Sequence, residues 1–102
     1  MPNTHHNPYI IFYIYIFYHQ LSQLKHIFLL EDDETLARGI AMALEGPERT
    51  VQGAGTLQQA EICLMEKRFD LLILDLNLPD GNGLTLLRQL RQRGDAVPVI
   101  LL

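Results

Sequence analysis

The sequence has a single cysteine, no tryptophan and no surplus of positive charge. One cysteine, Cys63, excludes both an internal disulfide and a zinc site built from several cysteines. Because Cys63 lies within a helical pattern, we expect a small buried side chain rather than a reactive thiol. The 8 Lys and Arg residues against 12 Asp and Glu give a formal net charge of −4. Nucleic-acid binding by this segment would call for a basic patch, which this balance does not favour.

The sequence also lacks an apolar run long enough to cross a bilayer as a helix, which takes about 20 residues. The longest candidate is YIIFYIYIFY at residues 9–18. A signal peptide is not favoured either, because a basic segment before this run and a small-residue cleavage site after it are both missing. No Lys, Arg, Asp or Glu precedes Lys25. We therefore interpret residues 1–25 as an apolar and aromatic extension, either disordered or translated from upstream of the natural start. The domain itself is expected at residues 26–102.

Residues 26–102 alternate strand and helix signals. Apolar or β-branched runs predict strands at 26–30, 50–54, 71–74 and 98–102. Between them we expect three helices: one capped by Asp32 or Asp33 and ended at Gly46-Pro47, one at 57–67 capped by Thr56, and one at 84–93. Their core-facing positions are predicted to be Leu36, Ile40, Leu44, Ala60, Leu64, Leu84, Leu87 and Leu90. This alternation predicts right-handed βαβ units and a parallel sheet.

Acidic residues follow two of the predicted strands. The first strand ends at Glu31, Asp32 and Asp33, and the third ends at Asp75. In open parallel sheets the sites form outside the carboxyl ends of the strands, so neighbouring strands would bring these carboxylates into one crevice. Crowded carboxylates need a compensating cation, and an oxygen-only set suits Mg²⁺ or Mn²⁺. Beside such a cation, Asp75 could act as a nucleophile toward phosphorus.

A purely structural interpretation stays open for each acidic site alone. An Asp after a strand often caps the next loop, and acidic residues at a helix start often serve only the helix dipole. Two acidic sites at matching strand ends favour the metal site. The turn at 79–83 (PDGNG) would supply flexible backbone beside it, with Gly81 and Gly83 free to take positive φ.

Two motifs resemble the receiver domain of bacterial two-component response regulators: IFLLEDDE at 27–34 and DLLILDLNLPDGNGLTLLRQLR at 70–91. The resemblance implies a doubly wound, flavodoxin-like α/β fold with strand order 2-1-3-4-5. It implies that Asp75 is the phospho-acceptor and that Glu31, Asp32 and Asp75 hold Mg²⁺. The backbone carbonyl of Asn77 would be a further ligand, and Asp33 would be a helix cap rather than a ligand.

The resemblance also implies partners. A sensor histidine kinase would donate the phosphoryl group to Asp75, and DNA would be bound only through an effector domain that this sequence does not contain. The segment itself would bind neither nucleic acid nor membrane, and it would act in the cytoplasm as part of a transcription regulator.

The sequence departs from the family pattern after Leu102, where it ends. We expect an incomplete receiver of four strands and three helices, without the switch Ser or Thr, the family lysine and the dimerisation face. The strand at 98–102 would then be an exposed apolar edge, which favours aggregation. Two other functions stay open. A haloacid-dehalogenase-type phosphatase would need an acid at residue 77, where this sequence has Asn77. The chain could also be an inert fragment.

Overall fold

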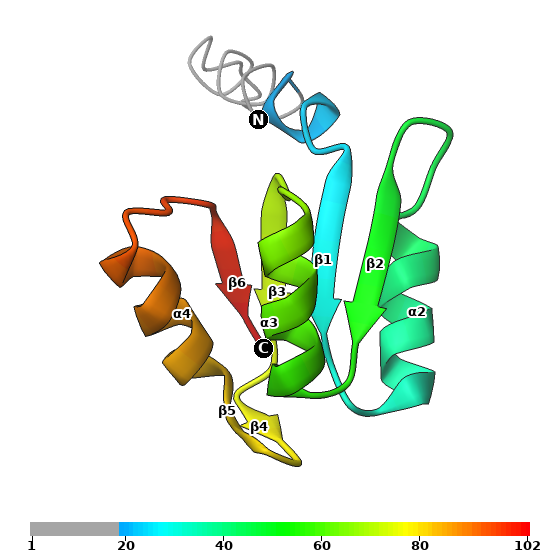
Figure 1. The fold of residues 1–102 in the computed structure, drawn as a ribbon. Helices are drawn as coiled ribbons and strands as arrows, with labels where there is room; N and C mark the ends of the chain where they lie inside the picture. The colour runs from blue at the N-terminus through cyan, green and yellow to red at the C-terminus, as the bar shows by residue number, and fades with distance from the viewer. Residues whose placement is uncertain (1–18) are drawn as a thin grey trace, which may run out of the picture.

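The computed structural model describes residues 19–102, and within them parallel strands form a central sheet. The strands are β1 (His26–Leu30), β2 (Thr50–Ala54), β3 (Leu71–Leu74) and β6 (Val99–Leu101), in the order β2-β1-β3-β6 (Figure 1). This order confirms the predicted doubly wound topology for the strands present. The apolar run at 9–18 and the rest of residues 1–18 lie outside the described residues.

The helices are α2 (Glu34–Leu44), α3 (Leu57–Glu66) and α4 (Gly83–Gln92). Each begins at a residue whose side chain accepts a backbone hydrogen bond from the first turn. Asp33 accepts from the Leu36 N–H at 3.0 Å, which selects Asp33 from the two predicted caps. Thr56 accepts from the Gln59 N–H at 3.2 Å, as predicted. Asn82 caps α4, so this helix begins one residue before its predicted start.

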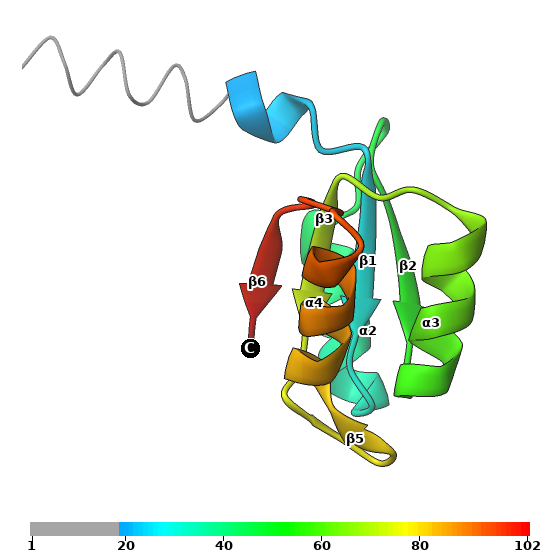
Figure 2. The same ribbon diagram turned by 60° about the vertical axis from the view of Figure 1, so that its left-hand side comes forward.

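The helices cover both faces of the sheet, α3 and α4 on one face and α2 on the other (Figures 1 and 2). Alternate residues of β1 and β3 point to opposite faces, because side chains alternate along a strand. Phe28 and Leu72 pack under α3 and α4, whereas Ile27 and Ile73 pack under α2. Both central strands are therefore buried on two sides, which explains why their sequences are apolar throughout.

The predicted helix faces are correct in part. In α2, Ile40 and Leu44 pack on the sheet together with Ala37, but Leu36 is 47% exposed. A strict four-residue spacing drifts by about 40° per step around a helix with 3.6 residues per turn. In α4 the predicted leucines repeat every three residues, which falls about 60° short of a full turn per step. Leu90 is buried as predicted, but the other buried leucine is Leu86, and Leu84 is only half-buried. Cys63 is half-buried beside the core of α3 and α4.

A short hairpin was not predicted. Strands β4 (Asn77–Leu78) and β5 (Gly81–Asn82) pair antiparallel between β3 and α4. Gly81 has φ of +147°, a conformation that favours glycine, at the turn of this hairpin. The buried side chain of Leu78 attaches the hairpin to the core. The acidic end of the sheet is therefore bordered by an ordered hairpin rather than by a flexible loop.

The described part of the predicted extension is attached to the domain. Residues 19–22 are helical, and Leu24 packs against the core under α2. The Arg49 guanidinium donates to the backbone carbonyls of Leu21 at 2.9 Å and Leu24 at 2.8 Å. None of the helices in residues 19–102 has the length and apolar character that a membrane span requires.

Candidate metal centre

The strand register places the two acidic segments side by side. Leu30 at the end of β1 pairs with Leu74 at the end of β3, so the next residues are Glu31 and Asp75. Backbone hydrogen bonds continue past these ends: the Asp75 N–H donates to the Leu30 carbonyl at 2.9 Å. The Glu31 N–H donates to the Ala54 carbonyl at 3.0 Å. The backbone of both acidic residues is therefore fixed by the sheet rather than by a loop.

Three carboxylates meet at this edge, as predicted. Glu31, Asp32 and Asp75 each offer an oxygen, and these oxygens all lie within 4.8 Å of one another. Glu31 is buried, Asp75 is half-buried and Asp32 is exposed, so protein covers the cluster at Glu31 and solvent reaches it at Asp32. Asp33 is not part of this cluster, because its side chain caps α2. The structure thus brings together three of the four carboxylates that follow these strands.

Burial and the neighbouring carboxyl groups both raise the pKa of Glu31. Burial is the largest cause that raises the pKa of this carboxyl above its ordinary value. A hydrogen bond from the Asp33 N–H to Glu31 Oε2, at 3.1 Å, acts in the opposite direction. Contact with the Asp75 carboxyl raises the Glu31 pKa further. A divalent cation would relieve this repulsion, and an oxygen-only donor set with one open side fits Mg²⁺ or Mn²⁺.

Asn77 and Gly83 hold the Asp75 segment in place. The Asn77 N–H donates to Asp75 Oδ1 at 3.3 Å, and the Asn77 side chain is exposed. A Cβ on Gly83 would lie 2.1 Å from the Asp75 carbonyl oxygen, so α4 can begin this close to Asp75 only with glycine. The predicted positive φ at Gly83 is wrong, since only Gly81 and Gly94 have positive φ among the described glycines. The reason for glycine at residue 83 is the close backbone approach.

Sequence reasoning assigned no role to Asp80. Its Oδ1 accepts from the Leu57 N–H at 2.8 Å and its Oδ2 from the Gln58 N–H at 3.1 Å. The bond from Leu57 is the largest cause that lowers the pKa of Asp80. Asp80 therefore ties the β4–β5 turn to the start of α3. The partners lie 22 and 23 residues away in sequence, so no local pattern could have revealed them.

Comparison with known proteins agrees with this geometry. A family model described as the response regulator receiver domain matches residues 27–102. The KDP operon transcriptional regulatory protein KdpE of Escherichia coli is 42% identical over 79 residues, which cover 78% of this chain and 35% of KdpE. The response regulator protein PmrA of Pseudomonas aeruginosa is 43% identical over 76 residues, which cover 74% of this chain and 34% of PmrA. The chain thus spans about a third of the length of these relatives.

Solved structures give the same result. The MaeR response regulator bound to beryllium trifluoride matches with a TM-score of 0.67 and 30% identity, over 78% of this chain and 66% of that one. The chemotaxis response regulator CheY4 of Vibrio cholerae matches with a TM-score of 0.70 over 78% of this chain and 68% of that one. At 18% identity, this second match concerns the fold alone.

Proposed function

The chain belongs to the family of response regulator receiver domains, and on this premise we propose that Asp75 accepts a phosphoryl group in a two-component phosphorelay. The observation that carries the proposal is the cluster of Glu31, Asp32 and Asp75 oxygens within 4.8 Å at the carboxyl ends of β1 and β3. Of the three, Asp75 combines partial exposure with a backbone held by hydrogen bonds. It can therefore be reached by a donor and still be positioned for attack.

The three side chains and the backbone carbonyl of Asn77 would hold Mg²⁺ or Mn²⁺. The cation would neutralise charge on the carboxylates and on the phosphoryl oxygens. Glu31 is buried and receives the Asp33 N–H, so its place in this set is fixed before any ligand arrives. Asp32 is exposed and can adjust to the cation. The Asn77 N–H orients Asp75 through Oδ1.

The transfer requires one bond to form and one to break. A carboxylate oxygen of Asp75 attacks the phosphorus of a phosphohistidine, and the bond between phosphorus and the imidazole nitrogen breaks. The electron pair of that bond stays on the imidazole, which can take up a proton from solvent. The product is an aspartyl phosphate on this chain. We propose an acceptor of this kind rather than an enzyme that turns over a substrate.

The relatives suggest the wider setting. KdpE and BasR of Escherichia coli are named transcriptional regulatory proteins, and this chain spans about a third of each. We propose that the donor is a sensor histidine kinase and that the readout is transcription through a DNA-binding effector domain. Both steps would take place in the cytoplasm.

A small-molecule donor tests the proposal without knowledge of the kinase. The chain is incubated with acetyl phosphate and Mg²⁺, and incorporation of a phosphoryl group is followed by intact-protein mass spectrometry. The proposal predicts incorporation that disappears with a chelator and in Asp75→Asn. The matched control is Asp33→Asn, which removes a neighbouring carboxylate while asparagine keeps the helix cap. Incorporation in Asp75→Asn, or equal loss in both variants, would contradict the assignment of Asp75. No incorporation in the unsubstituted chain would identify an inert fragment.

A further inference from the structure

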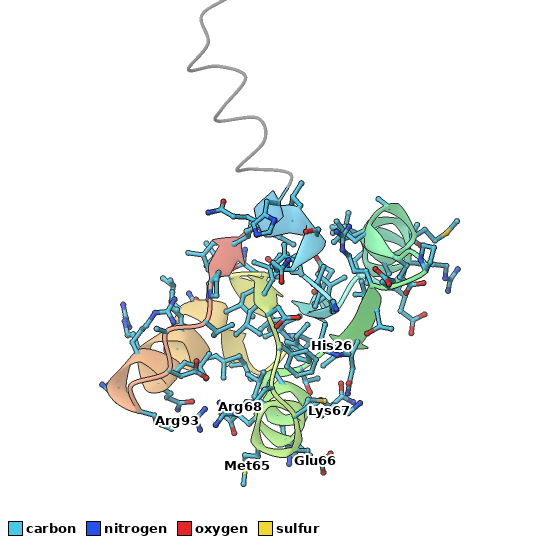
Figure 3. The ribbon with its side chains drawn as sticks, turned by 90° about the horizontal axis from the view of Figure 1, so that it is seen from above. His26, Met65, Glu66, Lys67, Arg68 and Arg93 are labelled. Carbon is cyan, nitrogen blue, oxygen red and sulfur yellow. The ribbon has the colours of Figure 1, made fainter. Side chains whose placement is uncertain are left out.

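An open cavity lies at the opposite end of the sheet from the acidic cluster. It is an open groove of about 980 Å³ between the segment that follows α3 and the segment that joins α4 to β6. Figure 3 looks down on this end, at the amino ends of the strands. The proposed phosphoryl chemistry does not use this groove.

Two arginines enter the groove without partners. Arg68 follows α3, and Arg93 is the C-terminal cap of α4. Neither side chain makes a hydrogen bond or ion pair with any residue in the range 19–102. Both are labelled at this end of the sheet in Figure 3, Arg68 on the segment after α3 and Arg93 at the end of α4. Each guanidinium lies beside the C-terminal end of its own helix, whose dipole favours a cation there, and each keeps its N–H donors free for a carboxylate of a ligand.

The acidic residues around the groove are mostly engaged already. Asp70 Oδ2 accepts the N–H groups of Lys25 and His26, both at 2.9 Å. Asp95 Oδ1 accepts the Val97 N–H at 3.0 Å. Glu66 lies on the other side of the end of α3 from Arg93 in Figure 3. The ammonium of Lys67 donates to Gln52 Oε1 at 3.3 Å, so Arg68 and Arg93 are the cations of the groove that no described residue engages.

The floor of the groove is apolar. Leu64, Phe69 and Val97 are half-buried there against the core, and Met65 at the rim is 79% exposed. A ligand for this groove thus needs two features: carboxylates spaced to reach the arginines, and an apolar side chain for the floor. An acidic peptide segment with aliphatic residues has both.

From these observations we propose that the groove at the amino end of the sheet docks an acidic, aliphatic peptide segment of a protein partner, with Arg68 and Arg93 pairing its carboxylates. Charge decides against nucleic acid as the occupant. The net charge of −4 and the acids Glu66, Asp70 and Asp95 at the groove repel any anion, but they repel a continuous polyanion more strongly than a peptide with a few separate carboxylates.

The test uses the full chain and a short fluorescein-labelled peptide that alternates glutamate with leucine. Binding is measured by fluorescence anisotropy, with the glutamine counterpart of the peptide and with oligothymidine as comparison probes. We expect Arg68→Glu combined with Arg93→Glu to weaken binding of the acidic peptide about tenfold, because each exposed pair contributes a few-fold and reversal adds repulsion. The matched control is Arg38→Glu, an exposed arginine on α2 at the other face of the sheet.

Each outcome decides the proposal. Support requires that the glutamate peptide binds more tightly than the glutamine peptide, that salt weakens this binding, and that only the double variant loses it. Absence of peptide binding, equal binding of both peptides, or equal loss in Arg38→Glu would overturn it. Tighter binding of oligothymidine would assign the groove to nucleic acid instead. Sedimentation velocity excludes a second copy as occupant if the unsubstituted chain and the double variant show the same oligomeric state.

Discussion

Replacement of Gly83 by alanine tests how closely α4 and the proposed acceptor are coupled. The added Cβ would lie 2.1 Å from the carbonyl oxygen of Asp75 and 3.1 Å from its carbonyl carbon, both backbone atoms that cannot rotate away. Overpacking of this kind lowers the free energy of unfolding by about 3 kcal/mol, and the better helix propensity of alanine offsets about 1 kcal/mol of this loss. We therefore expect a net loss of about 2 kcal/mol, or about 8–16 °C in Tm for a domain of this size.

The matched control is Gly39→Ala in the middle of α2. A Cβ at Gly39 would meet nothing within 4 Å, so this variant gains helix propensity without a clash. We expect it to be more stable than the unsubstituted chain by about 0.5–1 kcal/mol. Urea unfolding followed by circular dichroism measures both variants, and Mg²⁺ titration measures the site. Gly83→Ala should also bind Mg²⁺ more weakly, because Asp75 must shift. If Gly83→Ala matched Gly39→Ala in stability and in Mg²⁺ affinity, the close approach at Asp75 would not constrain the site.

Three further predictions concern charged side chains. Glu31→Gln should raise the free energy of unfolding in the presence of a chelator and should weaken Mg²⁺ binding. Because the pKa of Glu31 is raised, the free energy of unfolding without metal should fall as pH rises through that pKa. Urea unfolding at several pH values should show that the variant has lost this pH dependence. The pKa of Asp70 is lowered chiefly by the hydrogen bond from the His26 N–H, so its stabilising contribution is present above its ordinary value of 3.8 and is lost as pH falls through the lowered pKa. Asp70→Asn should reduce the loss of stability at acid pH. If the pH dependence of urea unfolding were unchanged in this variant, the hydrogen bonds from the Lys25 and His26 N–H groups would not contribute to stability. Arg49→Met should destabilise the chain by about 2 kcal/mol through the lost carbonyl contacts, whereas Arg38→Met should change little; equal effects in urea unfolding would contradict the role of Arg49.

The sequence was most informative where the signal was local. Strands β1, β2 and β3 have the predicted bounds, because runs of apolar or β-branched residues are short and end at acidic or glycine residues. Parallel strands end at one edge of a sheet, so Glu31 and Asp75 were expected to meet if their strands were neighbours, and the strand order itself came from the family resemblance. Residue type alone predicted the cap at Thr56 and narrowed the first cap to Asp32 or Asp33, of which the structure has Asp33.

The features that sequence reasoning missed depend on contacts distant in the chain. The Asp80 side chain reaches the start of α3, and Arg49 reaches carbonyls that lie 25 and 28 residues before it. Neither contact leaves a periodic pattern. The reason for Gly83 was also hidden, because the sequence marks a glycine but not whether φ or a neighbouring carbonyl requires it. Arg68 and Arg93, 25 residues apart in the sequence, line one groove only because α3 and α4 lie on the same face of the sheet (Figure 1).

The most direct test of the central claim is to locate the phosphoryl group chemically. After reaction with acetyl phosphate and Mg²⁺, borohydride reduces an aspartyl phosphate to homoserine, and peptide sequencing then identifies the modified residue. We expect homoserine at residue 75, formed only when Mg²⁺ is present. Modification at Asp32, Asp33 or Asp80 instead, or modification of Asp75 that is unchanged by a chelator, would contradict it.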